Sequence, residues 1–421
     1  MSERNPIICY DMQTSLRRDK PTQGLMEERL FFELLDRFVV DASLEFLLGE
    51  RRVRVGGNKD AAPAAVVRIH NPRFFKRVLA YGNLGLGEAF MGRDFEMDEG
   101  SLTEFLTVLV RNRLDRRVAE ALNLSLAGRL LWIRFTNRLR GRRGNIATHY
   151  DNEDDSLFET FLDPRLVYSC GFVTDPQAGI ERFQLDKLKR VCDKLRLEPG
   201  ERLVDIGCGY GGLLIYAAQT YGVSGKGITL GRRHFERATA NVAAAGLADR
   251  IKIELLSYEK LAGSFDKLVS LGMMEHLRRS EYRRFIDVVS RLLTEKGMGL
   301  FQYCGCSVPK NDNDPFIQKY IFPGSNQPKL SEFVAELEDH DMAVLDVENL
   351  VRHYAFTLKE WTRNFERNSS RLDGDLFDDR FKRMWQYYLE CGAAAAFASA
   401  GALYQILFAR NYPLPMPLQR V

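Results

Sequence analysis

The 421-residue sequence predicts an α/β protein with a doubly wound, mostly parallel sheet, preceded by a smaller N-terminal α+β domain. Two observations predict the larger part. Short apolar runs alternate with helical patterns from residue 163 onward, which is typical of parallel strands joined by crossover helices. One of these runs ends in an acid and a glycine-rich turn, Asp205 to Gly212. The third observation is that strand and helix patterns are mixed over residues 26–120.

Composition and charge narrow the class of protein. The chain is 45% hydrophobic and 28% charged, as in globular proteins, and its length suits two or three domains. Residues 1–144 hold 25 Lys and Arg against 19 Asp and Glu, a net charge of +6, whereas the remainder holds 35 against 38, a net charge of −3. A basic N-terminal part suits an anionic partner such as a membrane surface.

Cysteine usage and the N-terminus indicate a compartment. The seven cysteines contain no CxxC pair, and the first twenty residues are polar and charged. We therefore expect a reduced, cytoplasmic protein without a signal peptide.

Local signals predict the N-terminal elements. Residues 1–25 are expected to form a loose polar head, and the domain over residues 26–120 to follow it. Ser101, with Glu104 three residues on, has the pattern of a capping box at a helix start. The other expected elements are a helix over 28–48, strands over 51–55 and 65–70, a helix from Asn71-Pro72 to about residue 81, a turn over 82–88 that leads into another helix, and an acidic loop over 94–100.

A basic stretch connects the two domains. Residues 129–143 combine several leucines and aromatic residues with six arginines, so we expect a basic, partly amphipathic linker helix within residues 121–148. Two interpretations stay open: the helix packs its apolar side on the next domain, or it contacts anionic phospholipid headgroups. Nucleic acid is not expected, because base-stacking aromatics interleaved with basic clusters are missing.

The C-terminal domain, expected over residues 149–421, follows the alternating pattern. The apolar run at 393–409 is interrupted by polar residues and is expected to be a buried helix and not a membrane span. The other expected elements are a helix over 184–195, the strand that opens the glycine turn, strands over 225–230, 251–255, 265–271 and 297–304, and helices over 232–245 and 281–293.

The glycine turn fits two cofactors. Gly207, Gly209 and Gly212 match the dinucleotide pattern GxGxxG, and Arg232 and Arg233 stand where a 2′-phosphate of NADP would be read. This pattern alone has low specificity, since glycines also serve tight turns and close packing.

The acid before the first glycine favours a cationic cofactor. A carboxylate at Asp205 would repel a pyrophosphate, whereas S-adenosylmethionine carries an ammonium and a sulfonium and no phosphate. Asp205, Gly207, Gly209 and Gly211 form the Asp-x-Gly-x-Gly-x-Gly opening of Rossmann-like class I methyltransferases. We therefore expect S-adenosylmethionine on this turn.

An ordered set of motifs resembles one family, the cyclopropane-fatty-acid synthases and related lipid methyltransferases, over about residues 65–410. The segments besides the glycine turn are Gly85-Leu86-Gly87-Glu88, His149-Tyr150-Asp151, Leu162-Asp163, Tyr168-Ser169-Cys170, Gly272-Met273-Met274-Glu275-His276, Asp314-Pro315, Lys319-Tyr320-Ile321-Phe322-Pro323, His353-Tyr354, Thr357-Leu358 and Trp361.

The resemblance implies a reaction and assigns residues to it. In this family the cis double bond of a phospholipid acyl chain takes the methyl of S-adenosylmethionine, and the resulting carbocation loses a proton to bound bicarbonate as a cyclopropane closes. The implied cofactor-binding residues are Tyr168, Ser169, Asp205, Gly207, Gly209, Gly211, Thr229 and Leu230. The implied bicarbonate-site residues are Cys170 through its backbone, Glu275 and Tyr354. We expect His149 and His276 to support the site without acting in catalysis.

One departure from the family pattern bears on the product. Cys304 stands where the family has a bicarbonate-binding histidine, and a thiol is a weaker hydrogen-bond donor than imidazole. Two alternatives to ring closure therefore stay open: methyl transfer that ends in a methyl-branched or methylene chain, and, more distantly, a lipid-binding subunit without activity. The resemblance also implies a homodimer, peripherally associated with the inner face of the membrane.

The basic linker generates a testable prediction. Replacing Arg138, Arg140, Arg142 and Arg143 with Ser should weaken binding to anionic vesicles, and the deficit should shrink at high salt because salt screens exposed charges. Vesicle co-sedimentation at low and high ionic strength measures both effects. Unchanged binding to anionic vesicles would refute this role.

Overall fold

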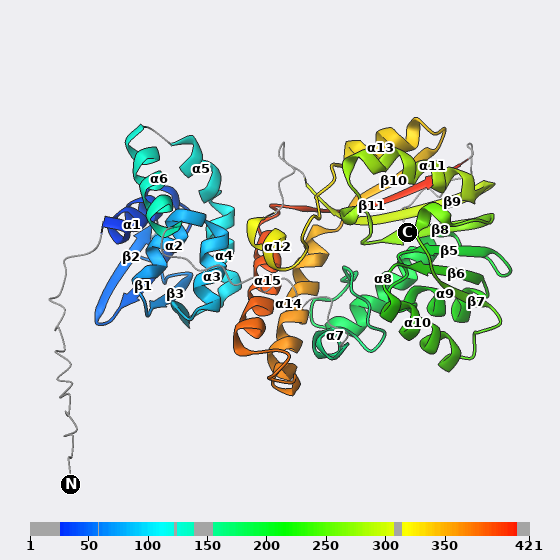
Figure 1. The fold of residues 1–421 in the computed structure, drawn as a ribbon, viewed down its shortest axis with the longest axis horizontal. Coiled ribbons are helices and arrows are strands. Elements are labelled where there is room, and N and C mark those ends of the chain that lie inside the picture. Colours follow the sequence, from blue (N-terminus) through cyan, green and yellow to red (C-terminus); the bar gives the residue numbers. More distant parts are fainter. Residues whose placement is uncertain (1–25, 58, 122–123, 139–154, 307–313, 411–421) are drawn as a thin grey trace, which may run out of the picture.

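The computed structural model describes residues 26–57, 59–121, 124–138, 155–306 and 314–410. The expected polar head, the arginines at 140, 142 and 143, and the His149-Tyr150-Asp151 motif lie outside the described residues. Figure 1 shows a smaller N-terminal unit and a larger α/β unit, with two long helices, α14 (Val351–Asn368) and α15 (Asp379–Phe397), lying between the two sheets.

The N-terminal unit is built on a four-stranded sheet in the order β2-β1-β3-β4. Strands β1 and β3 pair in parallel and the two outer pairs are antiparallel, so this unit is a mixed α+β structure. Its elements are α1 (Met26–Phe38), β1 (Ser43–Leu48), β2 (Arg51–Gly56), β3 (Ala65–Ile69), α2 (Arg73–Tyr81), α3 (Asn83–Met91), β4 (Phe95–Glu99), α4 (Leu102–Arg111), α5 (Leu114–Glu120) and α6 (Leu124–Arg138).

Three predictions in this unit are wrong. The helix expected over 28–48 ends at Phe38, because residues 43–48 pair with both β2 and β3 and bury Leu44 and Phe46 in the core. The acidic loop expected over 94–100 is strand β4, in which Phe95 is buried and Asp98 forms an ion pair with Arg68. The turn expected over 82–88 is mostly helix α3.

Capping and the linker helix follow the sequence more closely. The Ser101 side chain accepts a hydrogen bond from the backbone N–H of Glu104. The Glu104 carboxylate in turn accepts one from the backbone N–H of Ser101, which completes the capping box of α4. Helix α6 forms within the expected basic linker and contacts α2 of the N-terminal unit. Its Ile133 is buried, while Leu131 and Trp132 are exposed.

The larger unit confirms the doubly wound fold. Its seven-stranded sheet has the order β10-β11-β9-β8-β5-β6-β7, and the five strands from β9 to β7 are parallel. Its elements, besides α14 and α15, are α7 (Ser156–Phe161), α8 (Gly179–Leu195), β5 (Arg202–Ile206), α9 (Gly212–Tyr221), β6 (Ser224–Thr229), α10 (Arg232–Ala244), β7 (Ile251–Leu255), β8 (Phe265–Leu271), α11 (Tyr282–Leu292), β9 (Leu293–Gly305), α12 (Pro315–Tyr320), α13 (Leu330–Glu338), β10 (Ala343–Asn349) and β11 (Ala402–Ala409).

The buried helix expected over 393–409 is wrong in its second half. Helix α15 ends at Phe397, and Ala402–Ala409 is a fully buried strand between β9 and β10, antiparallel to both. A strand buried on both faces is apolar throughout, so its periodicity does not distinguish it from a buried helix. Within the described residues, no helix is long and apolar enough to cross a membrane.

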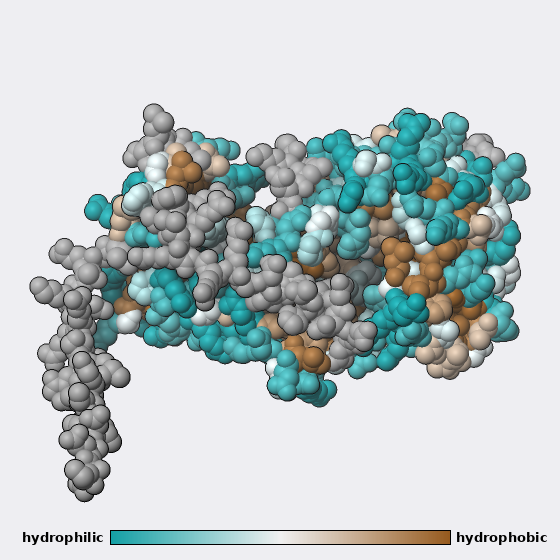
Figure 2. Space-filling model, in the orientation of Figure 1, coloured by the Kyte–Doolittle hydropathy of each residue, from teal (hydrophilic) through white to brown (hydrophobic). Residues whose placement is uncertain are grey.

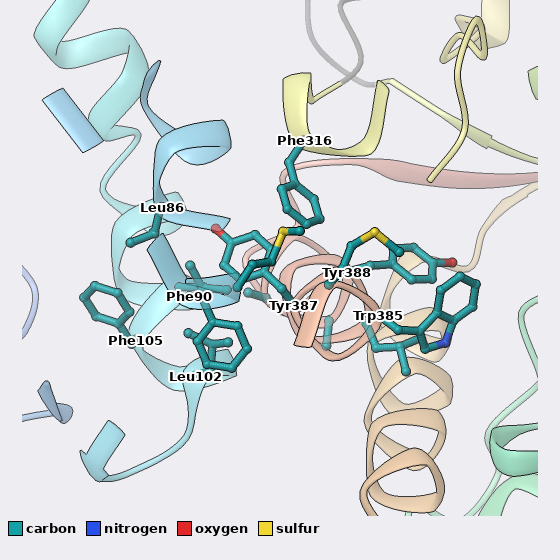
Figure 3. Packing of buried hydrophobic residues seen from close by; sticks show 14 of the residues in the cluster. Leu86, Phe90, Leu102, Phe105, Phe316, Trp385, Tyr387 and Tyr388 are labelled. Atoms are coloured by element: carbon teal, nitrogen blue, oxygen red, sulfur yellow. The ribbon is translucent and has the colours of Figure 1, made fainter. Parts of the chain in front are cut away.

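Aromatic packing joins the two units. One continuous cluster of buried residues runs from α1 to α15. Figure 3 shows two successive residues of α15 on opposite sides of this junction: Tyr387 lies with Phe90 toward the N-terminal unit, and Tyr388 lies with Trp385 toward the α/β unit. On the face of the molecule seen in Figure 2, the coloured surface is largely hydrophilic, and a patch of apolar side chains lies on the α/β unit.

The junction generates a stability prediction. A Cβ on Gly87 in α3 would lie 2.3 Å from the ring of Phe316 and 2.8 Å from the ring of Tyr387. Gly87→Ala should therefore lower the free energy of unfolding by about 1–3 kcal/mol, because overpacking forces rings or backbone to move. Urea denaturation measures this change.

The matched control is Gly128→Ala. Gly128 lies in helix α6, and a Cβ there would meet nothing within 4 Å. This variant should leave stability unchanged or raise it by up to about 1 kcal/mol, since alanine is the better helix former. Equal stability of Gly87→Ala and the wild type would contradict the packing account.

Candidate active site

The glycine turn requires left-handed backbone. Strand β5 ends at Ile206, and Gly207, Gly209 and Gly211 take φ values of +89°, +52° and +83° before α9 begins at Gly212. Residues with a Cβ avoid this region, so glycine is needed at each of the three positions. The turn exposes backbone at the carboxyl end of the central strand, which is where open α/β sheets bind ligands.

A cavity of about 590 Å³ opens at this turn. Seven of the eight predicted cofactor residues line it: Tyr168, Ser169, Asp205, Gly207, Gly209, Thr229 and Leu230. Leu230 is largely exposed at the cavity rim. The eighth residue, Gly211, lies behind the turn, where its Cβ position would face Ala238 of α10 at 3.6 Å. Its role is therefore to shape the start of α9.

Five further residues line the cavity: Lys187, His234, Tyr258, Glu259 and His276. His276 is one of the two histidines expected to support the site, whereas the other four were not predicted. Lys187 left a signal: it stands four residues before Val191 on the apolar face of a helix, although lysine normally faces solvent. The others stand in loops or first helical turns after strands, where a single sequence shows no periodicity.

The charge pattern of the cavity suits a cation. Asp205 is 4% exposed, and its Oδ1 has no hydrogen-bond partner among the described residues. Burial raises the pKa of Asp205 to about 7, and the nearby Lys187 ammonium opposes that rise. A ligand with a positively charged group would stabilise the ionised carboxylate and occupy its unused oxygen. The ammonium of S-adenosylmethionine meets this requirement.

The four predicted bicarbonate-site residues also come together. Glu275 lies in a short turn after β8, and Cys304 lies near the end of the neighbouring strand β9. The backbone N–H of Cys304 donates a 2.5 Å hydrogen bond to Oε1 of Glu275. Cys170 and Tyr354 pack with Cys304 in one small apolar cluster.

Burial favours the neutral forms of the groups in this second cluster. It raises the pKa of Glu275 to about 7 and that of the Cys170 thiol to about 12. Burial, followed by the Glu275 charge, also raises the pKa of the Cys304 thiol, and burial raises the pKa of Tyr354. The thiols and the phenol are therefore neutral hydrogen-bond donors at pH 7. Oε2 of Glu275 is buried without a partner among the described residues, so one acceptor is unused.

An aromatic wall connects the cavity to this cluster. The hydroxyl groups of Tyr168, at the cavity, and Tyr388 of α15 lie 2.8 Å apart, and Tyr388 also faces Tyr354. The ring of Trp361 contacts both Tyr168 and Tyr354. Aromatic faces attract cations, so a carbocation formed along this wall would be stabilised.

The doubly wound sheet, the glycine turn and the acid beneath it are those of an S-adenosylmethionine-dependent methyltransferase with a Rossmann-like fold. The family model for mycolic acid cyclopropane synthetase matches residues 137–406. The chain belongs to this family, which confirms the resemblance seen in the sequence and favours S-adenosylmethionine rather than a dinucleotide as the cofactor.

Two relatives and one solved structure show how far the similarity extends. The cyclopropane-fatty-acyl-phospholipid synthase of Escherichia coli K12 is 36% identical over 367 residues, which cover 87% of this chain and 92% of the relative. Tuberculostearic acid methyltransferase UfaA1 of Mycobacterium tuberculosis is 31% identical over 364 residues, covering 82% and 83%. Mycolic acid cyclopropane synthase CmaA1, complexed with SAH and CTAB, superposes with a TM-score of 0.58 at 27% identity, covering 63% of this chain and 97% of CmaA1.

The raised pKa of Glu275 generates a prediction about stability and pH. The folded protein keeps this carboxyl protonated up to about pH 7, whereas the unfolded chain loses the proton near pH 4.5. The folded state therefore binds the extra proton between these values, and the free energy of unfolding falls as pH rises through this window. In the Glu275→Gln variant, the free energy of unfolding should fall by roughly 2–3 kcal/mol less over this pH window than in the wild type.

Urea denaturation at pH 5, 6, 7 and 8 measures the effect. The matched control is Glu295→Gln, because Glu295 is exposed on β9 and far from the cluster. It should retain the wild-type dependence, part of which arises from Asp205. A Glu275→Gln variant with the full wild-type dependence would show that Glu275 titrates normally.

Proposed function

We propose that this protein transfers the methyl of S-adenosylmethionine to the cis double bond of an unsaturated acyl chain in a membrane phospholipid, and that a cyclopropane fatty acid is the product. The observation that carries the proposal is the buried cluster of Glu275, Cys304, Cys170 and Tyr354, joined to the cofactor cavity by Tyr168 and Tyr388. The relative from E. coli, named a cyclopropane-fatty-acyl-phospholipid synthase, supports the substrate class.

The chain's own residues meet the physical needs of this reaction. An alkene is a weak nucleophile, so it must meet the sulfonium in line and without water. The half-enclosed cavity and the ring of Tyr168 would order the methyl donor. The aromatic faces of Tyr168, Trp361 and Tyr354 would stabilise positive charge on the acyl chain.

Proton removal falls to the second cluster. Bicarbonate, if held there, would supply the base that takes the proton from the new methyl group. The residues fit such an oxyanion: Tyr354 and Cys304 offer neutral O–H and S–H donors, and Glu275 with its pKa of about 7 can donate when protonated. The thiol is the weakest donor of the set.

A second product deserves equal testing because Cys304 replaces the family's histidine. If the bicarbonate were bound less firmly, a different proton could be removed from the carbocation. The same methyl transfer would then give a methyl-branched or methylene chain. One relative is named for tuberculostearic acid rather than a cyclopropane acid, which supports this alternative. A lipid-binding subunit without activity is the more distant alternative, and the retained Asp205, Glu275 and Tyr354 argue against it.

We also propose how the protein meets its substrate. Peripheral association with the inner membrane face is supported by the basic linker and by the exposed Leu131 and Trp132 of α6. A homodimer is carried over from the resemblance to the family.

Product analysis separates these proposals. The pure protein is incubated with labelled S-adenosylmethionine and vesicles of unsaturated phospholipid, and the released acyl chains are analysed by gas chromatography with mass spectrometry. We expect label in the acyl chains, mainly as cyclopropane. Mainly methyl-branched chains would favour the alternative, and acyl chains without label would exclude both.

Cys304→His tests the role of this position. Imidazole is the stronger donor, so the ratio of cyclopropane to branched product should rise, by up to roughly tenfold if one hydrogen bond of about 1.4 kcal/mol is gained. Cys192→Ala, a buried thiol in another apolar cluster, is the control and should leave the ratio unchanged. An unchanged ratio in Cys304→His would show that position 304 does not govern proton removal.

A further inference from the structure

The cofactor cavity contains a buried cation whose presence the reaction does not explain. Lys187 of α8 is 1% exposed, and it lines the cavity wall. A fully buried lysine loses its hydration, so it persists only when it is paired or when it serves a ligand. Burial lowers the pKa of Lys187 to about 8, which still leaves the ammonium charged at pH 7.

The hydrogen bonding of Lys187 points toward Ser169. Its Nζ donates a 3.0 Å hydrogen bond to Oγ of Ser169, which also lines the cavity. Among the described residues, no carboxylate oxygen lies within 4.0 Å of Nζ, so Lys187 forms no ion pair there. The charges of Asp163 and Asp205 attract the ammonium from farther away. The ammonium therefore has one hydrogen-bonded partner and a nearby negative field.

The same contact determines what Ser169 can bind. A hydroxyl that accepts a hydrogen bond from an ammonium keeps its own O–H free to donate elsewhere. The loop that contains Ser169 is held in place, since Gln184 of α8 donates a 2.8 Å hydrogen bond to the backbone oxygen of Ser169. Ser169 thus presents a polarised donor, backed by a positive charge, at the cavity. Such a donor suits an anionic group.

Asp205 supplies the opposite charge beside it. Its unpartnered Oδ1 is buried at the same cavity, and Asp205 and Lys187 influence each other's ionisation. The cavity therefore offers one site for a cation and one for an anion in close proximity. S-adenosylmethionine carries this pair at its amino-acid end, where an ammonium and a carboxylate stand on one carbon atom.

We propose that Lys187, acting through Ser169, is a positioning residue that recognises the carboxylate of S-adenosylmethionine, while Asp205 recognises the adjacent ammonium. These residues would hold the amino-acid end of the cofactor at the glycine turn. The proposal rests on the cofactor and not on the lipid product.

Binding calorimetry with two ligands tests it. One ligand is S-adenosylmethionine, and the other is its decarboxylated analogue, which keeps the ammonium and the sulfonium but lacks the carboxylate. Lys187→Met removes the charge at similar side-chain volume. It should weaken binding of S-adenosylmethionine roughly 10- to 100-fold, as for the loss of a charge-assisted hydrogen bond.

Binding of the decarboxylated analogue distinguishes recognition of the carboxylate from a general effect on the cavity. Lys187→Met should bind it as well as the wild type does or more tightly, because a wholly cationic ligand no longer meets a nearby ammonium. Ser169→Ala should show the same selective loss, and the double variant should add little, since Lys187 acts through Ser169. Lys189→Met, which alters an exposed lysine of the same helix, is the control and should match the wild type with both ligands.

Other outcomes overturn the proposal. Equal weakening of both ligands in Lys187→Met would show that the lysine serves only the fold or the charge balance of Asp205. A double variant with fully additive losses would show that it does not act through Ser169. Should Lys187→Met not fold, Lys187→Gln is judged by the same criterion. If the protein binds the cofactor as described but produces no labelled acyl chains, this inference holds and only the proposed lipid function is refuted.

Discussion

The parallel pairing of β5, β8 and β9 is the constraint on which the site depends. Asp205 of β5 is in register with Val269 of β8, and Leu271 of β8 is in register with Gln302 of β9. All three strands therefore end at the same edge of the sheet. The glycine turn, the turn that holds Glu275, and Cys304 meet there although about 100 residues separate the first from the last.

Burial at this edge gives the two halves of the site different electrostatic properties. Asp205 and Glu275 both have pKa values raised to about 7 by burial, but among the described residues a lysine opposes that rise only at Asp205. The first carboxyl thus suits a cationic cofactor, whereas the second lies among neutral thiols and a phenol. The proposed reaction would use this difference, since one step places positive charge and the other removes a proton.

Helices α14 and α15 close the site and attach the N-terminal unit to it. They carry Tyr354, Trp361 and Tyr388, which form the wall between cavity and cluster, while Tyr387 packs against the N-terminal unit (Figure 3). Gly87 of α3 permits this close contact, because a Cβ there would collide with the rings of Phe316 and Tyr387, whereas a Cβ at Gly85 would collide with Arg77 of α2 in the same unit. Gly87 therefore serves packing between the units, and the turn expected over 82–88 is short because α3 begins at Asn83.

The sequence by itself determined the doubly wound fold, most strands of the larger sheet and the cofactor turn, because periodicity, glycine and the leading Asp205 are local signals. It also predicted a common site for Glu275, Cys304, Cys170 and Tyr354, though only through resemblance to a family. The tertiary structure alone decided that residues 43–48, 95–99 and 402–409 are strands, because their state depends on partners distant in the chain. It alone placed the ammonium of Lys187 against Ser169 and near Asp205, because the position of Lys187 on the apolar face of a helix indicates burial but does not identify partners in other elements.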